Sequence, residues 1–153
     1  MNTMQRTSAY VPMPDGVHLA VDVWRGADLA EDHAQPVLLL STRYWRAFDL
    51  AEGDETLQPL HALARHAASR GVTVVNVDSR GSGASFGTRR TEWSDEERDD
   101  FGPVMDWIVA QPWSSGRIAT FGYSYGGNPP FPAAAKGNPA LPPIRPQFAA
   151  FRP

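Results

Sequence analysis

Three short apolar segments alternate with two segments of helical periodicity in the second part of the sequence, and this order constrains the fold most strongly. The apolar segments have the length and continuity of strands that are buried on both faces. The segments between them place apolar side chains on one helical face. A strand–helix–strand–helix–strand order predicts a parallel sheet with right-handed crossovers. The predicted strands cover residues 37–40, 72–77 and 118–121, and the first predicted helix covers residues 57–68.

The limits of the two helices follow from glycine and proline. Gly71 comes after the first helix as a C-terminal stop. The second helix should begin near Asp99 or Asp100, which places Pro103 in or near the first turn, where its missing N–H costs least. Residues 111–112 (Gln-Pro) end this helix, and Ser115-Gly116 read as a turn that leads toward the last strand.

The first 36 residues show a different pattern. Residues 17–24 alternate apolar and other side chains, which predicts a half-buried strand. Asp15-Gly16 reads as a hairpin turn, so residues 6–11 are expected to pair with this strand. Residues 25–36 are polar and indicate a loop.

Composition excludes several classes of function. The length of 153 residues suits one domain, with 42% hydrophobic and 20% charged residues, as in soluble globular proteins. A net charge of -3 argues against nucleic acid as a partner, and the absence of cysteine excludes disulfides and thiolate metal sites. We find no signal peptide, no apolar run of about 18 residues and no cofactor motif. We therefore expect a cytoplasmic location, with no membrane partner.

The most chemically specific motif is G-x-S-x-G at residues 122–126, directly after a buried strand. A sharp turn there lifts the Ser124 hydroxyl above the sheet, and the N–H of Tyr125 then faces the developing oxyanion. The sequence therefore predicts Ser124 as a nucleophile. The alternative is a glycine-rich turn without chemistry.

The loop at residues 78–85 also contains two glycines after a strand. A dinucleotide-binding loop would need a third glycine where this chain has Phe86. A tight structural loop at the carboxyl end of the strand is the better interpretation.

Together these stretches resemble the cocaine-esterase and Xaa-Pro dipeptidyl-peptidase-like (CocE/NonD) hydrolases. The resemblance covers residues 10–127 and is carried by residues 15–24, the loop at 78–85, and Asp106-Trp107 with residues 111–117 leading into the serine motif. It implies an α/β-hydrolase fold that cleaves esters or amides through an acyl-serine. The expected fold is the N-terminal half of a mostly parallel sheet with flanking helices, truncated after the nucleophile elbow.

The resemblance also implies a second oxyanion donor, the hydroxyl of Tyr44, with Arg43 where the family usually has proline. The substrate would be a small ester or amide, or a short peptide of the aminoacyl or X-Pro type. However, α/β-hydrolases order their triad Ser, Asp or Glu, then His. All four histidines (18, 33, 61 and 66) precede Ser124, and no Asp or Glu follows it. We therefore expect an inactive chain.

Two alternatives stay open. One is a binding or regulatory module that uses the half-sheet without catalysis, and the other is a Rossmann-type nucleotide-binding domain, which the glycine spacing disfavours. His61 and His66 are interpreted as solvated surface residues.

The predicted organisation is a catalytic-domain part at 1–127 and a proline-rich, irregular or disordered tail at 128–153. That tail holds eight of the 14 prolines, which are incompatible with a regular helix after the elbow. Nothing in it has strand patterning, so residues 118–121 should form an open sheet edge, and the isolated chain should self-associate.

Overall fold

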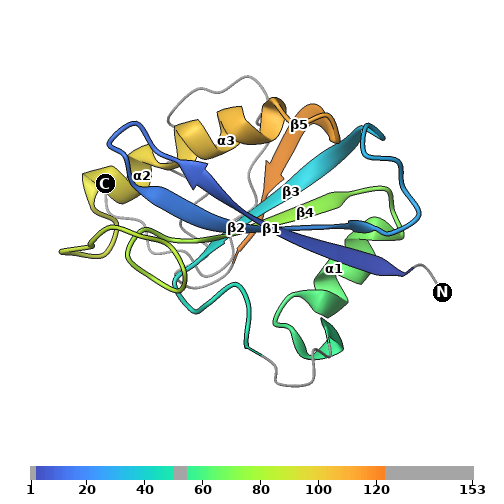
Figure 1. Ribbon diagram of the computed structural model, residues 1–153, viewed down its shortest axis with the longest axis horizontal. Coiled ribbons are helices and arrows are strands. Elements are labelled where there is room, and N and C mark those ends of the chain that lie inside the picture. The colour runs from blue at the N-terminus through green and yellow to red at the C-terminus, as the bar shows by residue number, and fades with distance from the viewer. Residues whose placement is uncertain (1–2, 50–54, 123–153) are drawn as a thin grey trace.

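The part of the chain that the structure describes forms a five-stranded sheet with helices on both faces (Figure 1). The computed structural model describes residues 3–49 and 55–122. The elements, in chain order, are β1 (Met4–Pro12), β2 (His18–Gly26), β3 (Gln35–Thr42), the 3₁₀ turn η1 (Glu55–Leu57), α1 (His61–Ala68), β4 (Thr73–Asp78), α2 (Asp95–Asp99), α3 (Phe101–Val109) and β5 (Ser114–Thr120).

The strand order is β1-β2-β4-β3-β5. β3 pairs in parallel with both β4 and β5, as the alternation of strands and helices predicts. The hairpin of β1 and β2 is also confirmed, and β2 runs antiparallel to β4. The fold class is therefore confirmed, and the described part of the sheet is mixed because its first two strands form a hairpin.

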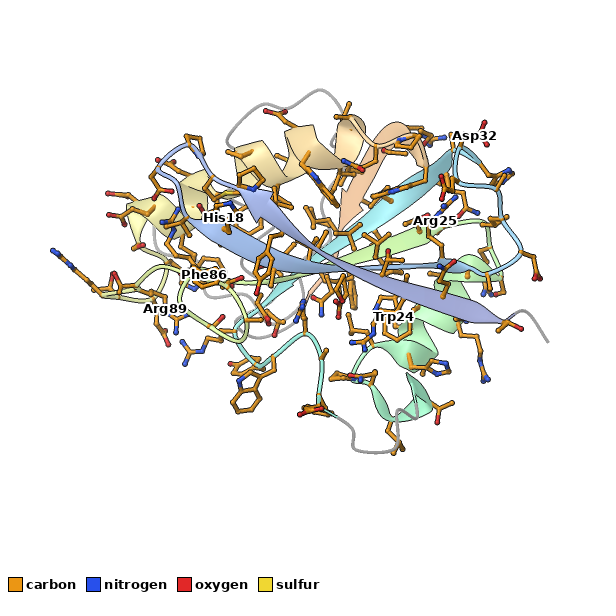
Figure 2. All side chains as sticks on the ribbon, in the orientation of Figure 1. His18, Trp24, Arg25, Asp32, Phe86 and Arg89 are labelled. Carbon is orange, nitrogen blue, oxygen red and sulfur yellow. The ribbon has the colours of Figure 1, made fainter. Side chains whose placement is uncertain are left out.

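Two apolar clusters hold the helices against the sheet. One face packs against α3 through residues such as Val75, Ile108 and Ile118. The opposite face packs against α1, with Trp24, Val74 and Ala67 in contact. Figure 1 shows α3 and α1 on opposite sides of the sheet, and in Figure 2 the Trp24 side chain lies on the side of α1.

The prediction of a half-buried strand at residues 17–24 is wrong in its burial. Ala20, Asp22 and Trp24, the expected solvent face, are 1%, 0% and 1% exposed. They lie on the face that α1 covers, and β2 sits between β1 and β4. A strand inside a sheet with both faces covered loses its solvent side.

Both helical segments differ from the prediction at their N-terminal ends. The segment 57–68 divides into η1 and α1, because Pro59 disfavours helical geometry in the residue before it. The second segment begins earlier, with α2 at Asp95. Ser94 caps α2 by accepting a hydrogen bond from the N–H of Glu97, while α3 starts at Phe101 as expected, with Pro103 in its first turn.

Two strands begin earlier than predicted. β3 begins at Gln35, inside the predicted loop, and β5 begins at Ser114, so the predicted turn at Ser115-Gly116 lies within a strand. The pairing of these strands shifts register between Gln35 and Val37, and Gly116 has a φ of 74°. A bulge with a glycine in the left-handed region therefore extends the pairing.

Several predicted features lie outside the described residues, namely Ser124, Tyr125 and the segment 128–153. Over residues 3–49 and 55–122, no helix has the length and apolarity needed to cross a membrane.

Candidate active site

Tyr44 and Gly122, the described residues next to or within the predicted site, lie near the edge where the parallel strands β3, β4 and β5 end. The last residues of β3 and β4, Thr42 and Asp78, are directly paired in register. The pairing of β5 with β3 continues beyond Thr120, because the N–H of Phe121 donates to the carbonyl of Leu39 at 3.2 Å. Gly122, the first residue of the serine motif, therefore lies at this edge of the sheet.

A cavity of about 250 Å³ connects this edge to the predicted oxyanion donor Tyr44. Tyr44 is 52% exposed and lies in the loop that follows β3. Its side chain lines the same cavity as Gly122, so the structure brings the two segments together. The remaining wall is mainly apolar and comes from the end of the sheet, the Tyr44 loop and α1, including Leu40, Trp45, Phe48, Leu60, Leu63 and Phe121.

The loop at residues 78–85 is confirmed as a tight structural loop. Gly81 and Gly83 have φ values of 65° and 55°. The N–H groups of Gly81, Ser82, Ala84, Ser85 and Phe86 all donate to acceptors within the protein. A phosphate-binding loop needs such N–H groups to be free to face its ligand. In this loop the N–H groups already have acceptors within the protein, which argues against the nucleotide-binding alternative.

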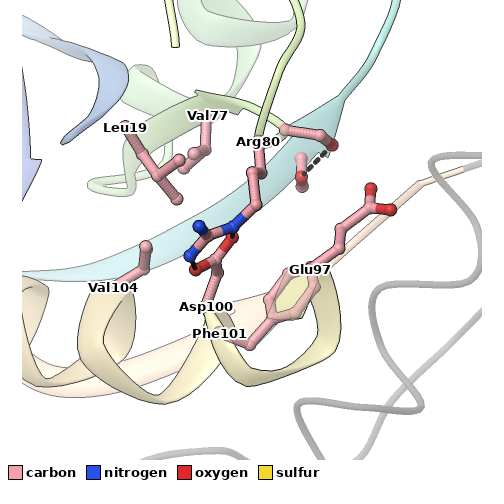
Figure 3. A pocket seen from close by; sticks show the side chains of 9 residues that line it. Leu19, Val77, Arg80, Glu97, Asp100, Phe101 and Val104 are labelled. Carbon is pink, nitrogen blue, oxygen red and sulfur yellow. Dashed lines mark hydrogen bonds and ion pairs between the residues drawn. The ribbon is translucent and has the colours of Figure 1, made fainter. Parts of the chain in front are cut away.

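Arg80 anchors this loop to two other parts of the fold. Its guanidinium donates to both oxygens of Asp100, at 3.0 and 2.5 Å, and to Asp15 in the hairpin turn at 2.6 Å. Figure 3 shows the bidentate pair with Asp100 between β4 and α3. Hydrogen bonding to Asp100 raises the pKa of Arg80 above its usual value, so the arginine stays charged. The adjoining cavity of about 10 Å³ leaves no room for a substrate, so this arrangement is structural.

A second group of buried charges lies nearer to the predicted site, and sequence reasoning missed it. Arg46 lies between two carboxylates, with its Nη1 3.3 Å from Asp78 and its Nε 3.2 Å from Asp22. Asp78 and Asp22 are 1% and 0% exposed. Burial raises the pKa of the Asp78 carboxyl, while hydrogen bonds from the N–H groups of Ala84 and Arg46 oppose that rise.

The histidines do not gather at this edge. His66 is exposed and contacts Arg70, as predicted for a surface residue. His61 differs from the prediction, because it is half-buried and packs edge-on against Trp24, with 5.9 Å between ring centroids. His18 and His33 are exposed. The described ranges hold no group of three or more His, Cys, Asp or Glu side chains that could bind a metal ion.

Comparison with known proteins identifies relatives along nearly the whole chain. A candidate serine esterase of Mycobacterium bovis is 39% identical over 157 residues, which cover 97% of this chain and 25% of that protein. The cocaine esterase of a Rhodococcus species is 33% identical over 144 residues, which cover 94% of this chain and 23% of that enzyme. The chain therefore spans about a quarter of the length of these relatives.

The structural and family comparisons agree with this result. A crystal structure of a CocE/NonD family hydrolase from Staphylococcus aureus superposes with a TM-score of 0.70 at 26% identity, and the match covers 90% of this chain and 26% of that one. The profile of the X-Pro dipeptidyl-peptidase (S15) family matches residues 15–152. On the evidence of its strand order, its relatives and this profile, the chain belongs to the X-Pro dipeptidyl-peptidase (S15) family of α/β-hydrolases.

Proposed function

We propose that this chain carries the nucleophile and the oxyanion donors of a serine hydrolase that cleaves esters or amides. Ser124 Oγ would attack the acyl carbonyl and lose its proton to a base, and the N–H of Tyr125 and the hydroxyl of Tyr44 would stabilise the tetrahedral oxyanion. The departing alcohol or amine takes the proton from the base. Water then attacks the acyl-serine, which releases the acid and restores the serine.

One observation carries this proposal: Tyr44 and Gly122 line the same cavity. Tyr44 comes from the loop after β3 and Gly122 from the end of β5, which are neighbouring strands. Two donors on opposite sides of one acyl group would have to come from such a pair of segments. The family supports an ester, an amide or an X-Pro peptide as the substrate class.

The base would have to come from outside these 153 residues, since no histidine follows Ser124. Without a base, a serine hydroxyl is a weak nucleophile. We therefore expect the 153-residue chain to hydrolyse p-nitrophenyl acetate no faster than its Ser124→Ala variant. A clear rate difference between the two would mean that another group activates the serine.

A composite enzyme tests the role of Ser124 directly. In it, this chain replaces the matching quarter of the Mycobacterium bovis relative, which is to supply the acid and the base. We expect hydrolysis of p-nitrophenyl acetate by the composite and a loss of about 10⁶-fold in kcat with Ser124→Ala. Ser115→Ala, at an exposed position in β5, is the matched control. Activity that survives Ser124→Ala would refute the proposal. A second composite, in which this chain is joined to the relative after Gly127, shows whether a loss of activity comes from the position of the junction.

A further inference from the structure

The loop that carries Tyr44 has no regular secondary structure, yet polar side chains fix it at three points, and two of these side chains, Asp78 and Gln58, are buried. The N–H of Tyr44 donates to Thr42 Oγ1 at 2.9 Å. The N–H of Arg46 donates to Asp78 Oδ1 at 2.8 Å. The amide of Gln58, which is 5% exposed, binds both the N–H and the carbonyl of Phe48, at 2.8 and 2.9 Å. Residues 43–48 are therefore held in one conformation by the ends of β3 and β4 and by the segment before α1.

The backbone of Trp45 shows that this conformation is imposed from outside. Its φ is 67°, in the left-handed region that large side chains rarely adopt. Its side chain is 61% exposed, so burial of the indole does not compensate for the strain. Such a residue persists only where its surroundings fix the chain on both sides. The hydrogen bonds at the N–H groups of Tyr44 and Arg46 flank Trp45 directly.

Asp78 makes the most contacts of the three anchoring side chains. Besides the N–H of Arg46, its carboxylate accepts from the Arg46 guanidinium at 3.3 Å and from the N–H of Ala84 at 3.0 Å. Gly83 lies against the same carboxylate, because a Cβ atom at Gly83 would overlap Asp78 Oδ2. The glycine loop thus determines where this carboxylate sits, and the carboxylate fixes the loop after β3.

We propose that Asp78 is the positioning residue for Tyr44, and that Gly83 sets the place of its carboxylate. The catalytic consequence of this positioning rests on the proposed function, in which the Tyr44 hydroxyl donates a hydrogen bond to the oxyanion. The positioning itself is a property of the described fold and can be measured without any reaction.

Two glycine variants of the full chain separate positioning from general stability. Gly83→Ala and Gly81→Ala both place an alanine at a positive φ in the same loop. Only Gly83→Ala meets Asp78, while the new methyl of Gly81→Ala approaches the backbone of Gly87 and Arg89. Hydrogen exchange read by mass spectrometry suits this chain, because it tolerates self-association.

We expect Gly83→Ala to speed exchange about tenfold or more in peptides that cover residues 43–49, and Gly81→Ala to leave those peptides unchanged. Asp78→Asn should also speed exchange in the peptides that cover residues 43–49. If Gly83→Ala speeds exchange along the whole chain, as a globally destabilised protein would, the result for Asp78→Asn decides the proposal. Asp100→Asn, in the other buried ion pair, is its control. Unchanged exchange at 43–49 in Asp78→Asn, or an equal rise in both controls, would overturn the proposal.

The composite enzyme then tests the catalytic consequence. Asp78→Asn should lower kcat with little change in KM, and should cause no further loss in a Tyr44→Phe background, since both changes act through one hydroxyl. Additive losses would mean that Asp78 acts on catalysis by another route. An inactive composite would count against the proposed function alone, because the exchange measurements decide the positioning independently.

Discussion

At the scale of single residues, Tyr44 is the clearest test of the proposed oxyanion site. It lies beside Arg43, whose guanidinium carbon is 5.6 Å from the centre of its ring, and it lines the cavity that reaches Gly122. A phenol at this place can donate a hydrogen bond to an oxyanion, and phenylalanine keeps its shape without the donor. The change Tyr44→Phe therefore isolates the hydroxyl.

We expect Tyr44→Phe to lower kcat of the composite enzyme by about 10²- to 10³-fold, the usual cost of removing one oxyanion donor. Tyr10→Phe is the matched control, because Tyr10 is 49% exposed and its hydroxyl donates to the carbonyl of Ala84 at 3.3 Å on the surface. The rates of ester hydrolysis by the two variants give the answer. Equal rates would remove Tyr44 from the mechanism.

The residues that sequence reasoning missed share one physical property. Asp22, Asp78, Gln35 and Gln58 are polar but at least nine-tenths buried, and each has a hydrogen-bond or ion-pair partner elsewhere in the chain. Hydropathy patterns assign such residues to the surface, since burial is favourable only once the partner is in place. By contrast, Ser124 and Tyr44 could be proposed from a local motif and a family resemblance.

At the scale of secondary structure, the start of α2 shows how a short helix is stabilised at its N-terminus. Ser94 Oγ accepts from the N–H of Glu97 at 3.3 Å, and Glu97 Oε2 accepts from the N–H of Trp93 at 3.0 Å. Glu97 is 2% exposed and Trp93 has a φ of 57°. This reciprocal arrangement resembles a capping box, with the glutamate bonded one residue earlier than usual.

We expect Ser94→Ala to lower the free energy of unfolding by about 0.5–2 kcal/mol, because the N–H of Glu97 loses its acceptor. Ser115→Ala, at an exposed position in β5, should change it little. Thermal melts followed by circular dichroism check this, at one protein concentration, since association shifts the apparent stability. If both variants melt at the same temperature, the cap does not stabilise the fold.

The elements were predictable where local pattern and tertiary contacts agree. The second helical segment was expected to place its apolar side chains on one face, and Phe101, Val104, Met105 and Ile108 of α3 are all buried. The early starts of β3 and β5 were not predictable, because they depend on a bulge between two strands distant in sequence. Strand ends that are fixed by pairing carry little local signal.

At the scale of the whole molecule, the strand order is the property that the local pattern leaves open. The alternation of strands and helices predicts parallel neighbours, but it does not say on which side of β3 each crossover returns. In the structure β4 lies between β2 and β3, and β5 lies beyond β3.

This order leaves β5 with a partner on one side only, within residues 3–49 and 55–122. The N–H of Phe121 points to β3, so the alternation along the strand turns the backbone of Ile118 and Thr120 to the other side. Ile118 and Ala119 are uncharged, and the single charge of β5 is Arg117. An uncharged strand edge is a template for pairing with another chain.

We therefore expect the 153-residue chain, expressed alone, to self-associate, with an apparent mass that rises with concentration in light scattering after size exclusion. Ala119→Lys should lower the association, because a lysine on an edge strand must lose water when a second strand pairs there. Ala62→Lys, at an exposed position of α1, adds the same charge away from the edge and should leave the association unchanged. A chain that stays monomeric over a hundredfold concentration range would refute the prediction. Equal effects of the two lysines would assign the association to net charge, and the edge of β5 would then have no special role.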